Sequence, residues 1–127
     1  MELPVELKGF GRPPTFGGRD EEWPDWSFLM KAYLSMMHED LSRALEQVEG
    51  VDREVSLVEL EARLPGIGRW ARQAYYQMAM TCRGTALGIV KAVERNNVIE
   101  AWRRLVLRYE PEAGPRLQQM MSRILQP

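Results

Sequence analysis

The sequence has little of what most enzyme and metal sites need, because its 127 residues include one cysteine and one histidine. Cys82 has no partner for an intramolecular disulfide, which is typical of a protein from a reducing compartment. A zinc site made of Cys and His needs about four ligands, more than this chain contains. A nucleophile and its base could be assembled only around His38 or one of Lys8, Lys31 and Lys91. We therefore expect no enzyme activity, no metal, no cofactor and no small-molecule substrate.

Other absences narrow the class of protein further. The sequence has no run of about 18 apolar residues, so we expect no membrane span. Its first residues, Met1 to Pro4, lack the basic and apolar regions of a signal peptide. Gly66 and Gly68 are not followed by the lysine of a phosphate-binding loop. The net charge of -1 and pI of about 5.9 argue against a protein that works by holding phosphates. These features predict a soluble, cytoplasmic protein.

The length suits one domain, and a hydrophobic content of 45% is enough for a packed core. Residues 1–22 are rich in Pro and Gly and have no helical period. Because a residue before a proline avoids the helical region, we predict an extended N-terminal arm over 1–22. The arm would pack along the domain surface or wait for a partner, with Phe16 as an apolar anchor. Residues 23–127 are expected to form one helical domain.

Apolar residues recur with a helical period through the rest of the chain, and no long segment alternates with period two. Ser56 and Glu59 have the spacing of a capping box, and Gly50 is expected to end a helix in the left-handed conformation. The sequence therefore predicts an all-α fold, a compact bundle of six to seven short helices after the arm. The expected helices cover 24–37, 39–48, 57–64, 68–82, 86–93, 98–109 and 117–125.

Large residues on these apolar stripes are the expected core anchors, because each buried side chain contributes about 1.5–3 kcal/mol. The anchors are Phe16, Trp26, Leu34, Tyr75, Trp102, Leu105, Tyr109 and Leu117. Trp23 and Trp70 lie at expected helix starts, where a contact role competes with burial, since tryptophan is enriched at binding hot spots. His38 is expected in a turn or at a helix cap, and Cys82 is expected to be buried and inert.

Charge is divided along the chain. Residues 1–65 contain 14 acidic and 7 basic side chains (net -7), and residues 66–127 contain 4 acidic and 10 basic ones (net +6), which sum to the total of -1. Either the halves interdigitate within one bundle, or an acidic face of one copy meets a basic face of the next. A third interpretation is direct nucleic-acid binding by the stripe of Arg103, Arg104 and Arg108, which Glu100 and Glu110 dilute. Together with Trp23 and Trp70, these three arginines are the candidate interface residues.

Several motifs resemble the Gag polyprotein of copia-type LTR retrotransposons. Phe16-Gly17-Gly18, followed by Trp26 and Phe28 and an amphipathic helix through Leu34, resembles the opening of these proteins. The run Ala101-Trp102-Arg103-Arg104-Leu105, then Tyr109, Arg116-Leu117 and Ile124-Leu125, resembles their C-terminal signature. Gly84 to Val90 occupies the place of the preceding helix. The resemblance extends over about residues 10–127.

This resemblance implies a capsid-type domain, similar to the N-terminal half of a retroviral capsid protein. Members of the family self-assemble into shells that package element RNA, so it implies a homo-oligomer. The sequence departs from a full Gag because it has no zinc knuckle and no protease motif. It stops at Pro127, where a second capsid half would be expected. RNA is therefore expected only indirectly or through regions downstream.

Two other classes of function stay open. One is a non-viral helical module whose arm or methionine-rich helices bind a partner protein. The other is a small helical enzyme acting through carboxylates such as Glu59 and Glu61, which are two residues apart and do not share a helix face. The leading hypothesis is the structural one, a capsid-like domain that binds further copies of itself.

Overall fold

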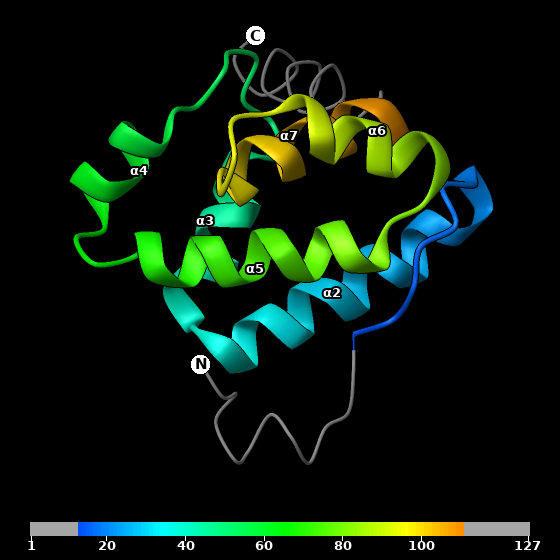
Figure 1. Ribbon diagram of the computed structural model, residues 1–127, viewed down its shortest axis with the longest axis horizontal. Coiled ribbons are helices and arrows are strands. Elements are labelled where there is room, and N and C mark those ends of the chain that lie inside the picture. Colours follow the sequence, from blue (N-terminus) through cyan, green and yellow to red (C-terminus); the bar gives the residue numbers. More distant parts are fainter. Residues whose placement is uncertain (1–12, 111–127) are drawn as a thin grey trace, which may run out of the picture.

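The computed structural model describes residues 13–110, and Figure 1 shows their arrangement. This part of the chain is helical, with no strand beyond an isolated bridge between Phe16 and Cys82. The predicted all-α fold class is therefore confirmed for these residues. The elements are η1 (Asp20–Glu22), α2 (Trp23–Met37), α3 (Glu39–Val48), α4 (Leu57–Arg63), α5 (Gly68–Thr81), α6 (Gly84–Ala92) and α7 (Val98–Tyr109).

Two parts of the prediction lie outside the described residues. Residues 1–12 of the expected arm belong there, as do the last expected helix, 117–125, and its core anchor Leu117.

Helix α7 lies against three other helices, α3, α5 and α6, while α2 packs on α3. In Figure 1, α2 and α5 cross the view in opposite directions, with α6 and α7 drawn above α5 and α2 drawn below it. Flanking residues link α2 and α5 at both ends. The His38 ring, where α2 ends, lies 5.4 Å from the Trp70 ring near the start of α5. Near the start of α2, Trp26 stacks on Phe16, whose backbone N–H bonds to the Thr81 carbonyl at 2.8 Å.

Local hydrogen bonds explain where the helices begin and end. Ser56 Oγ accepts the Glu59 N–H at 3.1 Å, and the Glu59 carboxylate accepts the Ser56 N–H, so the predicted capping box is confirmed. His38 is extended (φ -163, ψ 115) and separates α2 from α3. The expectation for Gly50 was wrong, because it is not among the residues with positive φ in the described part of the chain. Instead α3 ends in a turn, with the Val51 N–H bonded to the Val48 carbonyl at 3.1 Å.

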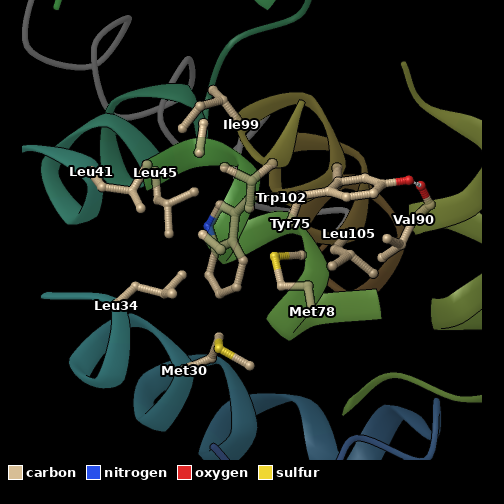
Figure 2. Packing of buried hydrophobic residues seen from close by; sticks show 14 of the residues in the cluster. Met30, Leu34, Leu41, Leu45, Tyr75, Met78, Val90, Ile99, Trp102 and Leu105 are labelled. Atoms are coloured by element: carbon tan, nitrogen blue, oxygen red, sulfur yellow. Dashed lines mark hydrogen bonds between the residues drawn. The ribbon is translucent and has the colours of Figure 1, made fainter. Parts of the chain in front are cut away.

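The core gathers around Trp102 of α7, which is completely buried. Figure 2 shows its indole among Met30 and Leu34 of α2, Leu45 of α3 and Met78 of α5. The core anchors Phe16, Trp26, Leu34, Tyr75, Trp102 and Leu105 are all buried, and Tyr109 is half-buried against them. The helical stripes read from the sequence therefore face a common core.

The described part of the expected arm differs from the prediction in one way, while its anchor Phe16 is buried as predicted. Residues 20–22 form the short helix η1 instead of continuing extended chain. Phe16 is completely buried and joined to the α5–α6 connection by the bonds Phe16 N–H to Thr81 O and Arg83 N–H to Phe16 O. The segment around Phe16 is thus part of the core. Its backbone pairs with Thr81 and Arg83, and its ring packs among the core side chains.

Gly18 turns the chain from this segment into η1. Its φ of +90 favours glycine, and a Cβ there would come within 2.8 Å of the Arg83 carbonyl oxygen. The Gly18 carbonyl also accepts the Tyr109 hydroxyl at 2.6 Å. Glycine at position 18 therefore allows the chain to pass close to the backbone of Arg83 and to bond with Tyr109 at the end of α7.

Candidate functional site

The described residues offer no group of three His, Cys, Asp or Glu that could hold a metal ion. Cys82 is buried, and burial raises the pKa of its thiol to about 12, so little thiolate is present at neutral pH. Glu59 is occupied in the capping box and with Arg53, and Glu61 accepts the N–H groups of Gly66 and Gly68 at 2.9 and 2.8 Å. Both carboxylates hold local structure, and they converge on no common site.

The most concentrated polar site is built around Glu100, a buried carboxylate on α7. Its Oε1 accepts the Val55 N–H at 2.9 Å and Arg103 Nε at 2.8 Å, and its Oε2 accepts Arg103 Nη2 and Arg104 Nε, each at 2.7 Å. Asn97 supports it, accepting the Glu100 N–H at 3.1 Å and donating to the Val55 carbonyl at 2.9 Å. This network fixes the loop before α4 onto the start of α7.

Electrostatics at Glu100 favour the charged form. Burial alone raises the pKa of a carboxyl group, but the hydrogen bonds from Arg103, Val55 and Arg104 outweigh it and lower the pKa of Glu100 to about 2. The carboxylate in turn raises the pKa of Arg103. All the acceptor positions of Glu100 are used within the chain, so this buried ion pair stabilises the fold instead of binding a ligand.

This network overturns part of the expected interface. Arg103 is buried, because its guanidinium pairs with Glu100 and also donates to the Val51 carbonyl at 3.3 Å. Arg104 is half-buried between Glu100 and Glu54, with 3.0 Å between Arg104 Nη2 and the Glu54 carboxylate. Only Arg108 is exposed, where it lies over the Tyr109 ring and pairs with Asp20 at 3.2 Å. The basic stripe of α7 is thus paired with Glu100 on its own helix and with Glu54 and Asp20 from the acidic half of the chain.

The two candidate interface tryptophans differ in burial. Trp23 is buried, stacked on Tyr109 with ring centroids 5.3 Å apart and its Nε1 bonded to Glu110 at 2.7 Å. Its expected contact role was wrong, because Tyr109 covers it. Trp70 is half-buried beside His38. Trp23 and Tyr109 join Phe16, Trp26 and Trp102 in a continuous aromatic cluster.

Large apolar side chains at the surface gather mainly on α2 and α5. On α2, Phe28 is 71% exposed, and Leu29 and Met36 are each about half exposed. On α5 the corresponding residues are Tyr76 and Met80. Aromatic residues and methionine are enriched in protein interfaces relative to the rest of the surface. Sequence reasoning missed these exposed side chains. Phe28 lies off the buried stripe of α2, and its position there could have predicted that it is exposed.

A surface pocket of about 220 Å³ lies where α3, α4 and the start of α7 meet. Its apolar lining comes from Ala44, Val48, Val55, Leu60, Leu64 and Ile99. Four polar residues complete it, namely Asp40, Arg43, Gln47 and Arg63. We call this the α3–α4 pocket. No local pattern in the sequence indicates this pocket, because its lining residues come from segments up to about half the chain apart.

Charge is also unevenly placed along the helices. No acidic residue occurs between Glu61 and Glu94, so all the charged residues of α5 and α6 are basic. Between residues 39 and 61, most of the acidic residues lie on α3 and α4.

The described helices include none that is long and apolar enough to cross a membrane. In comparisons with protein-family models, curated proteins and solved structures, no match to this chain was found.

Proposed function

We propose that this chain is a structural, capsid-type domain of a copia-like Gag, from a retrotransposon or a domesticated relative, and that it packs against further copies of itself. The proposal rests first on the ordered Gag-like motifs. Phe16, Gly18, Trp102 and Tyr109 of those motifs meet in the described residues, where Tyr109 bonds to Gly18 and packs on Phe16.

One observation carries the proposal beyond the resemblance, namely the exposed apolar side chains on α2 and α5. Phe28 keeps 71% of its surface in solvent although the core behind it is well filled. Aromatic residues are enriched in protein interfaces relative to the rest of the surface, which favours a contact role for Phe28. Interfaces of this kind have an apolar centre and a polar rim, and no catalytic group is needed. In this proposal the shell would form in the cytoplasm, and RNA would be captured through regions beyond this chain.

Sedimentation velocity of the purified chain over a concentration series, at low and high salt, tests self-association. We expect the mean mass to rise with concentration, and electron microscopy of the concentrated sample should show curved or closed assemblies. A chain that stays monomeric at every concentration and salt, alone and fused to its downstream region, would contradict the proposal.

A second candidate function is a helical module that binds a different protein, and the α3–α4 pocket favours it. An apolar pocket with a few charged groups at its edge is a common form of protein and ligand site. The downstream reading frame separates the two candidates. A second helical half followed by a zinc knuckle or a protease would support Gag, and an unrelated domain would support the module.

A further inference from the structure

Phe28 is the most exposed aromatic side chain among residues 13–110. The other residues of its outward helix surface include Leu29, which is about half exposed, and Asp25, one turn earlier on α2. Asp25, Phe28 and Leu29 therefore form a small ridge with an apolar top and an acidic end. Phe28 does not line the α3–α4 pocket, so the ridge leaves the pocket of its own copy unfilled.

The α3–α4 pocket has the size and chemistry to receive an aromatic ring. Its volume is about 220 Å³, whereas an apolar cavity of about 150 Å³ is enough to bind benzene. Its floor is aliphatic, with Val48, Leu60 and Ile99 contributing. Arg43 and Arg63 stand at its edge together with Asp40, which lies 3.6 Å from Arg43.

Charge selects the occupant of the pocket. Arg43 is shared between Glu39 and Asp40 on its own helix, while Arg63, near the end of α4, has an exposed side chain. The acidic end of the ridge, Asp25, carries the opposite charge to Arg63. Unlike charges at the edge of an apolar contact orient the partners and speed their encounter. A second copy of this chain thus presents both the ring and the carboxylate that the pocket suits.

We propose that the ridge of one copy binds the α3–α4 pocket of the next, with Phe28 in the pocket and Asp25 beside Arg63. This inference rests on the proposed function, because it names the contact through which copies would assemble. The ridge and the pocket are different surfaces of the chain, so the contact is head to tail. A head-to-tail contact continues from copy to copy and yields rings or open arrays instead of closed dimers.

Two single variants test the two halves of the contact in the full chain. Phe28→Asp removes the ring, and Gln47→Trp places an indole over the pocket from an exposed position of α3. We expect each variant alone to sediment as a monomer, with the dissociation constant weakened at least about 30-fold, as for loss of an interface hot spot. Val58→Asp is the matched control, because Val58 is 79% exposed on α4 and does not line the pocket. It should assemble like the wild type.

Mixing the two variants is the decisive step. Phe28→Asp retains a free pocket and Gln47→Trp retains a free ridge, so a 1:1 mixture should form a dimer and nothing larger. In a charge-reversal series, Asp25→Arg and Arg63→Asp should each weaken assembly, and the double variant should recover it. Circular dichroism and thermal unfolding confirm that each variant is folded, which these exposed positions favour.

The outcomes separate this inference from the proposed function. If the wild type assembles and Phe28→Asp assembles equally well, the inference is overturned while self-association stands. If Phe28→Asp is monomeric but the mixture forms no dimer, Phe28 binds another surface, such as its own counterpart, and the pocket assignment is overturned. If the wild type never assembles, the proposed function itself is overturned. If assembly depends on an added different protein, or changes when the N-terminal residues are removed, another protein or the chain's own N-terminal segment occupies the pocket. The assignment of a second copy as its occupant is then overturned.

Discussion

Replacing Glu100 with Gln should destabilise the chain strongly at neutral pH, because Arg103 would stay buried without its counter-charge. The pKa of Glu100 falls from an ordinary 4.5 to about 2 in the folded protein. Each pKa unit corresponds to about 1.4 kcal/mol, so the carboxylate contributes about 3 kcal/mol to the free energy of unfolding at pH 7. Breaking a buried ion pair by removing one partner costs about 3–5 kcal/mol in other proteins, which agrees in size.

The sign of the pH dependence follows from the lowered pKa. The stabilisation is complete above the unfolded pKa of Glu100, near 4.5, and is lost as the pH falls toward about 2. Glu100→Gln has no titrating group at this position. The difference in unfolding free energy between the wild type and Glu100→Gln should therefore shrink by about 3 kcal/mol between pH 5 and pH 2.

Urea unfolding followed by tryptophan fluorescence measures this difference at each pH, since Trp23, Trp26 and Trp102 are buried. Glu59→Gln is the matched control, because Glu59 is also held by an arginine and a backbone N–H but is partly exposed. It should lose much less stability. A difference for Glu100→Gln that does not change with pH would refute the reasoning, since it would arise from shape and hydrogen bonding without charge.

Three further outcomes are expected. Phe16→Ala should lower the free energy of unfolding by about 3–5 kcal/mol in urea titrations, because its ring is completely buried between α2 and the end of α5; a loss below about 1 kcal/mol would show that this segment is not part of the core. Asn97→Ala should cost about 1–2 kcal/mol, because it removes the cap of α7 and the bond to the Val55 carbonyl; an unchanged urea midpoint would contradict it. Cys82 should react with a thiol reagent only as fast as the chain opens, because its thiol is buried and protonated; rapid labelling of the native protein would contradict that.

The helices could be predicted well from the sequence because their apolar residues repeat with the period that the core requires. The prediction for 39–48 agrees with α3, and Ser56 and Glu59 cap α4 as their spacing indicates. A single residue was a less reliable guide than a repeated pattern. Gly50 looked like a left-handed helix stop, yet α3 ends in a hydrogen-bonded turn that needs no positive φ.

The surface could be predicted less well, because burial depends on contacts between distant segments. Trp23 is covered by Tyr109, which lies 86 positions later, so no local sequence pattern predicts that contact. Phe16 was predicted as a core anchor, but the backbone pairing with Thr81 and Arg83 that holds it in place joins segments too far apart for a local pattern to show. The α3–α4 pocket is formed by three segments in the same way, so only the assembled fold reveals it.

The arginines of α7 show how far the division of charge can drive assembly. Their spacing from Glu100, three and four residues for Arg103 and Arg104, is the spacing at which helical side chains meet, so their pairing could have been predicted. The pairs Arg104–Glu54 and Arg108–Asp20 join the basic half of the chain to its acidic half within one copy. These two pairs cancel part of the apparent dipole of -7 and +6 within one copy. In the proposed assembly the apolar Phe28 ridge supplies most of the contact between copies, so salt should change the rate of assembly more than its final extent.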